Sequence, residues 1–206
     1  MRRLWQAMRV MAITVLASCG DGSPSAPEPI VQPEAQLRFL SPAAGAVLSR
    51  DSVSFWAVAG RGREAALYFR PRAGSTDSVR FLRFKVESDT RLRRPDGTLV
   101  ADGDSIRITI RMRDFSRLIT QFEPSGMKFE RDPAELRLDF GNADGDYDDD
   151  GDDDAADDAK VSSFAIWKQE RAGLPWTKLT SLVEISGNLL EVKAQIGSFT
   201  NHAVAF

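Results

Sequence analysis

The sequence predicts an all-β protein, an antiparallel β-sandwich of about ten short strands. Polar and apolar residues alternate with a period of two in residues 105–111, 135–140 and 190–196, as in strands with one buried and one solvated face. Clusters of proline and glycine that favour turns separate these stretches. A length of 206 residues allows one domain of ordinary size with additional segments.

The N-terminus has the layout of a secretory signal. Residues 1–9 carry three arginines and no acid, and residues 10–17 form an apolar run too short to span a bilayer. Residues 16–19, Leu-Ala-Ser-Cys, resemble the bacterial lipobox at all four positions. The resemblance implies a signal peptide at residues 1–18 and acylation of Cys19, the only cysteine of the chain.

A tether is expected next, at residues 19–36. Its prolines disfavour regular hydrogen bonding and favour an extended chain. They are Pro24, Pro27, Pro29 and Pro33. The sequence thus predicts a lipid-anchored protein of the cell envelope. Gly20 stands where an aspartate would retain such a protein in the inner membrane, which favours the outer membrane.

The sandwich domain is predicted at residues 37–206. Shorter apolar runs indicate further strands at residues 52–59, 65–69, 79–86, 164–168, 182–185 and 202–206. The role of residues 37–78 stays open, with extra strands of the same sandwich as one option. Phe115, Leu118, Ile119 and Phe122 have the spacing of a helix face, but a Pro-Ser-Gly turn follows, so this tract is expected to be mixed.

An Asp-rich loop at residues 142–158 breaks the alternation. Residues 144–158 contain ten aspartates and no basic residue, although the formal net charge of the chain is only −3. One register fits a calcium loop, with aspartates at alternate positions, Gly151 at the sharp turn and an acid at the end. The expected ligands are Asp146, Asp148, Asp150, Asp152, Asp154 and Asp157.

The loop resembles dockerin and thrombospondin-type repeats more than a paired EF-hand. Only about one turn of helix is expected around residues 155–160, and Asp157 replaces the usual longer glutamate. Carboxylates favour a hard cation, and Ca²⁺ with weak affinity is expected. The alternative is a solvated loop kept disordered by charge repulsion.

The side chains available for catalysis are few. One cysteine and one histidine exclude a Cys/His zinc site and a Cys–His nucleophile pair. His202 is expected to be a structural or exposed strand residue, because no Gly-x-Ser-x-Gly elbow accompanies it. A hydrolase would instead need two facing carboxylates. The available glutamates are Glu64, Glu87, Glu123, Glu130 and Glu135.

Aromatic and basic residues suggest two surface hypotheses. Trp56, Trp167, Trp176 and Tyr68 could stack on sugars, but isolated tryptophans in strands are expected in the core. The arginines of residues 61–94 are expected on outward strand faces. A patch for anionic lipid or polysaccharide is the alternative.

From about residue 79 the chain resembles the ZU-five β-sandwich domain. The matching pieces are residues 84–86, 94–97, 104–110, 122–129, 133–138, 165–167, 175–176 and 198–204. Some relatives cleave themselves within a His-Phe-Ser motif, but Ser198 and Thr200 stand at the positions of that His and Ser. The resemblance therefore implies an interaction domain without self-cleavage.

These observations predict an envelope lipoprotein that acts as a non-catalytic binding module with a calcium-stabilised loop. Its expected partners are the membrane, through the N-terminal lipid, and an envelope protein or polysaccharide. Nucleic acid is not expected as a partner. The alternatives are a small carbohydrate-active hydrolase and a purely structural stalk.

Overall fold

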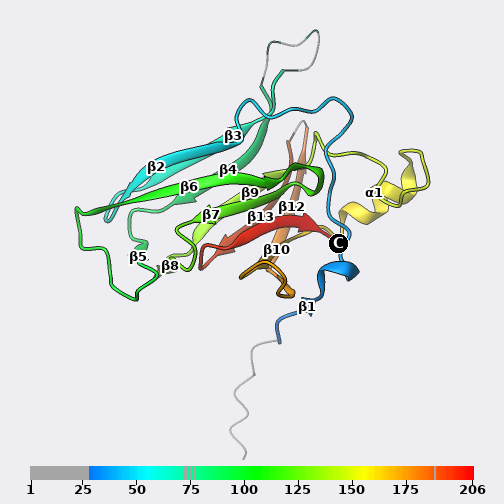
Figure 1. Ribbon diagram of the computed structural model, residues 1–206. Helices are drawn as coiled ribbons and strands as arrows, with labels where there is room; N and C mark the ends of the chain where they lie inside the picture. Colours follow the sequence, from blue (N-terminus) through cyan, green and yellow to red (C-terminus); the bar gives the residue numbers. More distant parts are fainter. Residues whose placement is uncertain (1–27, 72–73, 75, 77, 188) are drawn as a thin grey trace, which may run out of the picture.

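The computed structural model describes residues 28–206 except residues 72–73, 75, 77 and 188 (Figure 1). Two antiparallel sheets form two layers, which confirms the predicted all-β sandwich class. The predicted signal peptide, Cys19 and the predicted tether as far as residue 27 lie outside the described residues.

The larger sheet has seven strands in the order β1-β11-β10-β14-β7-β6-β2. These are β1 (Val31–Gln32), β11 (Trp176–Lys178), β10 (Ala165–Gln169), β14 (Asn201–Ala205), β7 (Ile119–Glu123), β6 (Ser105–Asp114) and β2 (Ser52–Val58). The smaller sheet has the order β12-β13-β9-β4-β3. Its strands are β12 (Ser181–Ser186), β13 (Leu189–Ile196), β9 (Ala134–Asp139), β4 (Arg80–Val86) and β3 (Arg63–Tyr68).

Short elements complete the fold. They are the two-stranded ribbon β5 (Arg91–Arg93) and β8 (Lys128–Glu130), the 3-10 turns η1 (Glu34–Gln36) and η2 (Phe115–Arg117), and the helix α1 (Ala155–Val161). The helix lies at one end of the sandwich (Figure 1).

The core lies between the sheets and is built from the predicted alternation. Ile106, Ile108 and Ile110 of β6 are buried, while the residues between them are more exposed. Phenylalanines fill the centre, where the ring of Phe84 lies 5.4 Å from that of Phe122, measured between centroids. This burial of apolar area is the main source of stability for the sandwich.

The folded domain begins before residue 37, the start that the sequence predicts. Residues 31–36, assigned there to the tether, form β1 and η1, and β1 pairs with β11. The carboxylate of Glu34 accepts hydrogen bonds from Arg117 and from the Trp176 indole N–H. These partners are distant in sequence, so the local proline content could not reveal them.

Residues 30–40, the N-terminal segment, run from β1 at the edge of the seven-stranded sheet to the end of β14, where Phe39 bridges to Ala205. Leu37 and Phe39 pack with Trp167, Trp176 and neighbouring alanines in a second, smaller core. Ile119 of β7 also belongs to this smaller core, so β2, β6 and residues 121–123 of β7 lie beyond the cover.

Residues 37–78 belong to the sandwich, and residues 115–122 form a turn and a strand. Residues 37–78 supply β2 to one sheet and β3 to the other. The helical spacing across residues 115–122 does not produce a helix: η2 is one turn, Leu118 adopts a left-handed conformation with φ of 48°, and β7 follows. Pairing of β7 with both β6 and β14 outweighs a short helix, whose nucleation is costly.

Candidate functional site

The Asp-rich loop is attached to the rest of the domain at its first turn. The amide of Asp144 donates to the carbonyl of Ser41, at 2.8 Å. The ring of Tyr147 makes an edge contact with Phe164, at 4.9 Å between centroids, and burial together with nearby aspartates raises the pKa of Tyr147 to about 12. Arg38 pairs with Asp149 at 3.0 Å. The loop therefore has both apolar and ionic contacts with its surroundings.

Asp157 organises the junction between the loop and α1. It is 1% exposed, and its carboxylate accepts hydrogen bonds from the backbone N–H groups of Tyr147, Asp148 and Asp154. These bonds, that from Asp154 foremost, hold the pKa of Asp157 below its usual value. Asp154 is the N-cap of α1, in a capping box with Asp157. The helix predicted around residues 155–160 is thus present, with Asp157 as its structural anchor.

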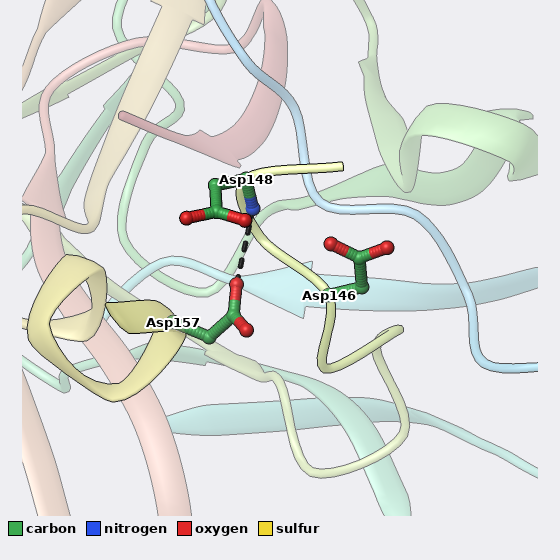
Figure 2. Close-up of side chains that lie close together, drawn as sticks. All are labelled: Asp146, Asp148 and Asp157. Carbon is green, nitrogen blue, oxygen red and sulfur yellow. Dashed lines mark hydrogen bonds between the residues drawn. The ribbon is translucent and has the colours of Figure 1, made fainter. Parts of the chain in front are cut away.

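The structure gathers the expected ligands into two groups of three. Carboxylate oxygens of Asp146, Asp148 and Asp157 lie within 4.8 Å of one another, and so do those of Asp152, Asp154 and Asp157. Figure 2 shows the first group, in which the Asp148 amide donates to Asp157. Asp150 belongs to neither group. The register suggested a single ring of six ligands. The structure instead forms two triads that share Asp157.

The donor chemistry of the first triad fits a hard divalent cation. All its side-chain donors are carboxylate oxygens. One carboxylate oxygen of Asp148 is buried without a hydrogen-bond partner in the described chain, and its burial with nearby aspartates raises the pKa of Asp148. Gly151 has φ of 101°, which is the turn expected at this position.

A second candidate site lies on the outer side of β2, β6 and β7. We call this surface the open face, and its residues are Ser54, Trp56, Arg107, Thr109, Arg111, Gln121 and Glu123. Trp56 is 57% exposed and lies opposite Arg107 across the β2–β6 pair. The hydroxyls of Ser54 and Thr109 share a hydrogen bond of 2.8 Å. An indole thus projects from a surface rich in hydrogen-bonding groups.

Two shallow hollows lie on the open face and beside it. The first has a volume of about 620 Å³ and is lined by side chains that include Arg107, Thr109 and Glu123. The second has a volume of about 240 Å³ and is lined by side chains that include Arg113 and Arg171. Gln121 and Ser125 line both hollows, so the two hollows are adjacent.

The three strand tryptophans differ in their surroundings. The expectation of a core position is confirmed for Trp167 and Trp176, which are buried, and is wrong for Trp56. The alternation of β2 explains the difference, because Trp56 shares a face with Ser54, whereas Phe55 packs against the core. This signal was present in the sequence.

The only histidine is fully buried. His202 lies in β14 with its ring 5.1 Å from that of Phe122, measured between centroids, and neither ring nitrogen has a hydrogen-bond partner within the described chain. Burial lowers the pKa of His202 to about 3. The ring is therefore neutral at physiological pH and is surrounded by protein.

Two carboxylates away from the loop face each other across β9 and β13. Asp139 and Glu191 are register partners, but they are only 8% and 1% exposed. Glu191 also pairs with Arg80 and Arg137. A polymeric substrate could not reach carboxylates that are buried in this way. Four of the glutamates considered for hydrolysis are paired with arginines, in the pairs Glu64–Arg83, Glu123–Arg111, Glu130–Arg93 and Glu135–Arg137.

The expected lipidation site, Cys19, lies outside the residues that the structure describes. Within the described residues, no helix has both the length and the apolar character needed to cross a membrane. Comparisons with models of protein families, with curated proteins and with solved structures found no match to this chain.

Proposed function

We propose that this protein is a lipid-anchored lipoprotein of the cell envelope that binds a polysaccharide through its open face, without catalysing a reaction. The observation that carries the proposal is the exposure of Trp56 on a polar sheet face, opposite Arg107, which lines a shallow hollow. An indole offers a large, rigid apolar surface for the apolar face of a sugar ring. Nearby hydroxyl, amide and guanidinium groups offer hydrogen bonds to its hydroxyls.

The position of the tether supports this proposal. Acylation at Cys19, which the resemblance of residues 16–19 to a lipobox implies, would put the anchor on the N-terminal side of β1, where the described chain enters the domain. The strand β2, which carries Trp56, lies at the opposite edge of the same sheet (Figure 1). A tether that leaves the domain at β1 keeps the open face away from the anchored edge.

The Asp-rich loop supplies the second part of the proposal. We propose that Ca²⁺ binds weakly at Asp146, Asp148 and Asp157 and makes this end of the sandwich more rigid. The unpartnered oxygen of Asp148 and the all-oxygen donor set support this role. Bound cation would also reduce the repulsion among the neighbouring carboxylates.

Calcium is expected to raise the melting temperature of the protein more than sodium chloride at the same ionic strength. Binding to the folded state alone stabilises it by mass action, whereas sodium only screens charge. Asp148→Asn should remove most of the difference between the two salts. Asp102→Asn, at an exposed position outside the loop, should leave it unchanged. Equal melting temperatures in both salts would contradict a specific site.

Trp56→Ala is expected to lower affinity for the bound polysaccharide at least about tenfold, or about 1.4 kcal/mol, because central tryptophans dominate binding surfaces. The ligand would be identified on a glycan array with the chain from residue 20 onward, and affinities measured by calorimetry. Leu182→Ala is the matched control, because Leu182 is 53% exposed on the other sheet. Unchanged affinity for Trp56→Ala would refute the site, and no binding to any polysaccharide would favour a stalk.

A further inference from the structure

The charges of the open face narrow the class of ligand. We infer that the polysaccharide is acidic, with sugar units that carry carboxylates, and that Arg107 and Arg171 recognise those carboxylates. This inference rests on the proposed function, because it concerns the ligand of the same face. It rests on a difference between the charged side chains that line the two hollows. The acidic ones have ion-pair partners, whereas three arginines have no such partner among the described residues.

The acidic side chains that line the hollows already have partners. Glu123 pairs with Arg111 at 2.9 Å, and Glu170 pairs with Lys168 at 2.7 Å. No other acid lines either hollow. The negative charges of the two hollows are therefore balanced within the protein itself.

The arginines of the hollows are balanced less completely. Arg107 and Arg171 have no ion-pair partner among the described residues, and Arg113 donates only to the neutral amide oxygen of Gln169, at 3.3 Å. Three guanidinium groups thus give the hollows a positive charge that no carboxylate of the described residues neutralises. An anionic ligand would complement this charge.

The outward arginines of the five-stranded sheet provide an internal comparison. They occupy similar strand positions, but each is paired with a glutamate, as in Arg80–Glu191, Arg83–Glu64 and Arg137–Glu135. Pairing with a glutamate, on the same strand or on a nearby one, is therefore the pattern for these arginines of that sheet. The unpaired Arg107 on β6 departs from it, and the departure coincides with a hollow and an exposed indole.

The arrangement of Trp56 and Arg107 suits a uronic acid unit. As cross-strand partners they project from the same face of adjacent strands. A sugar ring stacked on the indole would place its carboxylate beside the guanidinium, which binds carboxylates through two parallel hydrogen bonds. A neutral sugar would leave that guanidinium without a charged partner.

The two hollows together are long enough for several sugar units. They extend across β2, β6, β7 and β14, which is about 14 Å at ordinary strand spacing. Arg107 lines the first hollow and Arg171 the second, while Gln121 and Ser125 lie between them. The arrangement therefore fits repeated carboxylates along one chain better than a single charged monosaccharide.

Single-stranded nucleic acid is also anionic, but the open face suits it less well. Sites for single strands stack successive bases on several aromatic side chains. Among the described residues of the open face, Trp56 is the only large aromatic side chain. Nucleic acid is consequently an outcome of the test and not the proposed ligand.

The test compares acidic with neutral polysaccharides. Polygalacturonate and alginate are the acidic probes, dextran and mannan the neutral ones, and a thymidine oligonucleotide the nucleic-acid probe. Wild type should bind an acidic polysaccharide at least about tenfold more tightly than the others. Arg107→Gln should lower that affinity at least about tenfold, most clearly at low ionic strength. Arg61→Gln removes the same charge from an exposed turn and should have no effect.

The possible failures are distinguishable. If a neutral polysaccharide binds as tightly as the acidic ones through Trp56, and Arg107→Gln has no effect, this inference is overturned and the proposed function stands. Tighter binding of the oligonucleotide also overturns the inference. If no polysaccharide binds at all, both fail. Thermal melting of each variant separates loss of binding from loss of folding.

Discussion

His202→Leu is expected to stabilise the protein by about 2 kcal/mol more at pH 5 than at pH 7.5. Burial keeps the folded ring neutral by lowering the pKa of His202 to about 3, whereas the unfolded chain takes up a proton below about pH 6.5. Acidification from pH 7 towards pH 3 therefore favours the unfolded state of the wild type. Leucine has no proton to bind and also removes two ring nitrogens that lack partners in the described structure.

Urea unfolding of wild type and His202→Leu at several pH values from 4 to 8 would measure this difference. The two free energies of unfolding should diverge as the pH falls, because only the wild type carries the linked proton. Curves that run parallel over this interval would show that His202 titrates normally in the folded protein, and hence that the ring is not enclosed in the core.

Asp139→Asn is expected to have the opposite pH dependence and to stabilise the protein by about 2 to 3 kcal/mol above pH 7. Burial raises the pKa of Asp139 to about 6, and the neighbouring charge of Glu191 adds to this rise. The folded state therefore keeps its proton at pH values where the unfolded state, with a pKa near 3.8, has lost it. The stability of the wild type consequently falls as the pH rises from about 4 to 6.

Asparagine removes this penalty because it stays neutral, and its side-chain oxygen can still accept the hydrogen bond that the Gly141 amide donates to Asp139. The same unfolding series should show a large difference from wild type at pH 7.5 and almost none at pH 3.5. Asp102→Asn, an exposed control, should follow the wild type throughout. A destabilised Asp139→Asn at pH 7.5 would mean that the ionised carboxylate is needed by its neighbours.

The strands were the most predictable part of the fold. Alternation marks which face is buried, and β6, β9 and β13 begin and end within a few residues of the predicted stretches. The two-residue β1 was not predictable, because its neighbour β11 is more than 140 positions away in the sequence. Local pattern cannot encode such pairing. The same limit applies to η1, whose Glu34 is held by Arg117 and Trp176.

In the candidate sites, too, local features were predictable from the sequence and contacts between distant segments were not. The register of the Asp-rich loop predicted the turn at Gly151 and the helix that follows, both local features. It did not predict that Asp157 would accept three backbone hydrogen bonds and belong to two triads, because this depends on how the loop folds back. The exposure of Trp56 was encoded in its alternation with Phe55, but the unpaired state of Arg107 depends on tertiary structure.

The open face depends on how the N-terminal segment is placed. Leu37 and Phe39 of this segment cover an apolar part of the seven-stranded sheet, where Ala203 and Trp167 lie. They leave the polar part, with Trp56, Arg107 and Thr109, open to solvent. One sheet thereby provides both a buried surface for stability and the solvent-facing surface on which we propose that the polysaccharide binds.

The central claim is that a polysaccharide binds on the open face. Its most direct test is a map of backbone amide and indole N–H resonances, recorded while a fragment of the bound polysaccharide is added. We predict that the signals that move belong to β2, β6 and β7 and to the indole N–H of Trp56. Changes confined to β12 and β13, or to the Asp-rich loop, would contradict the claim.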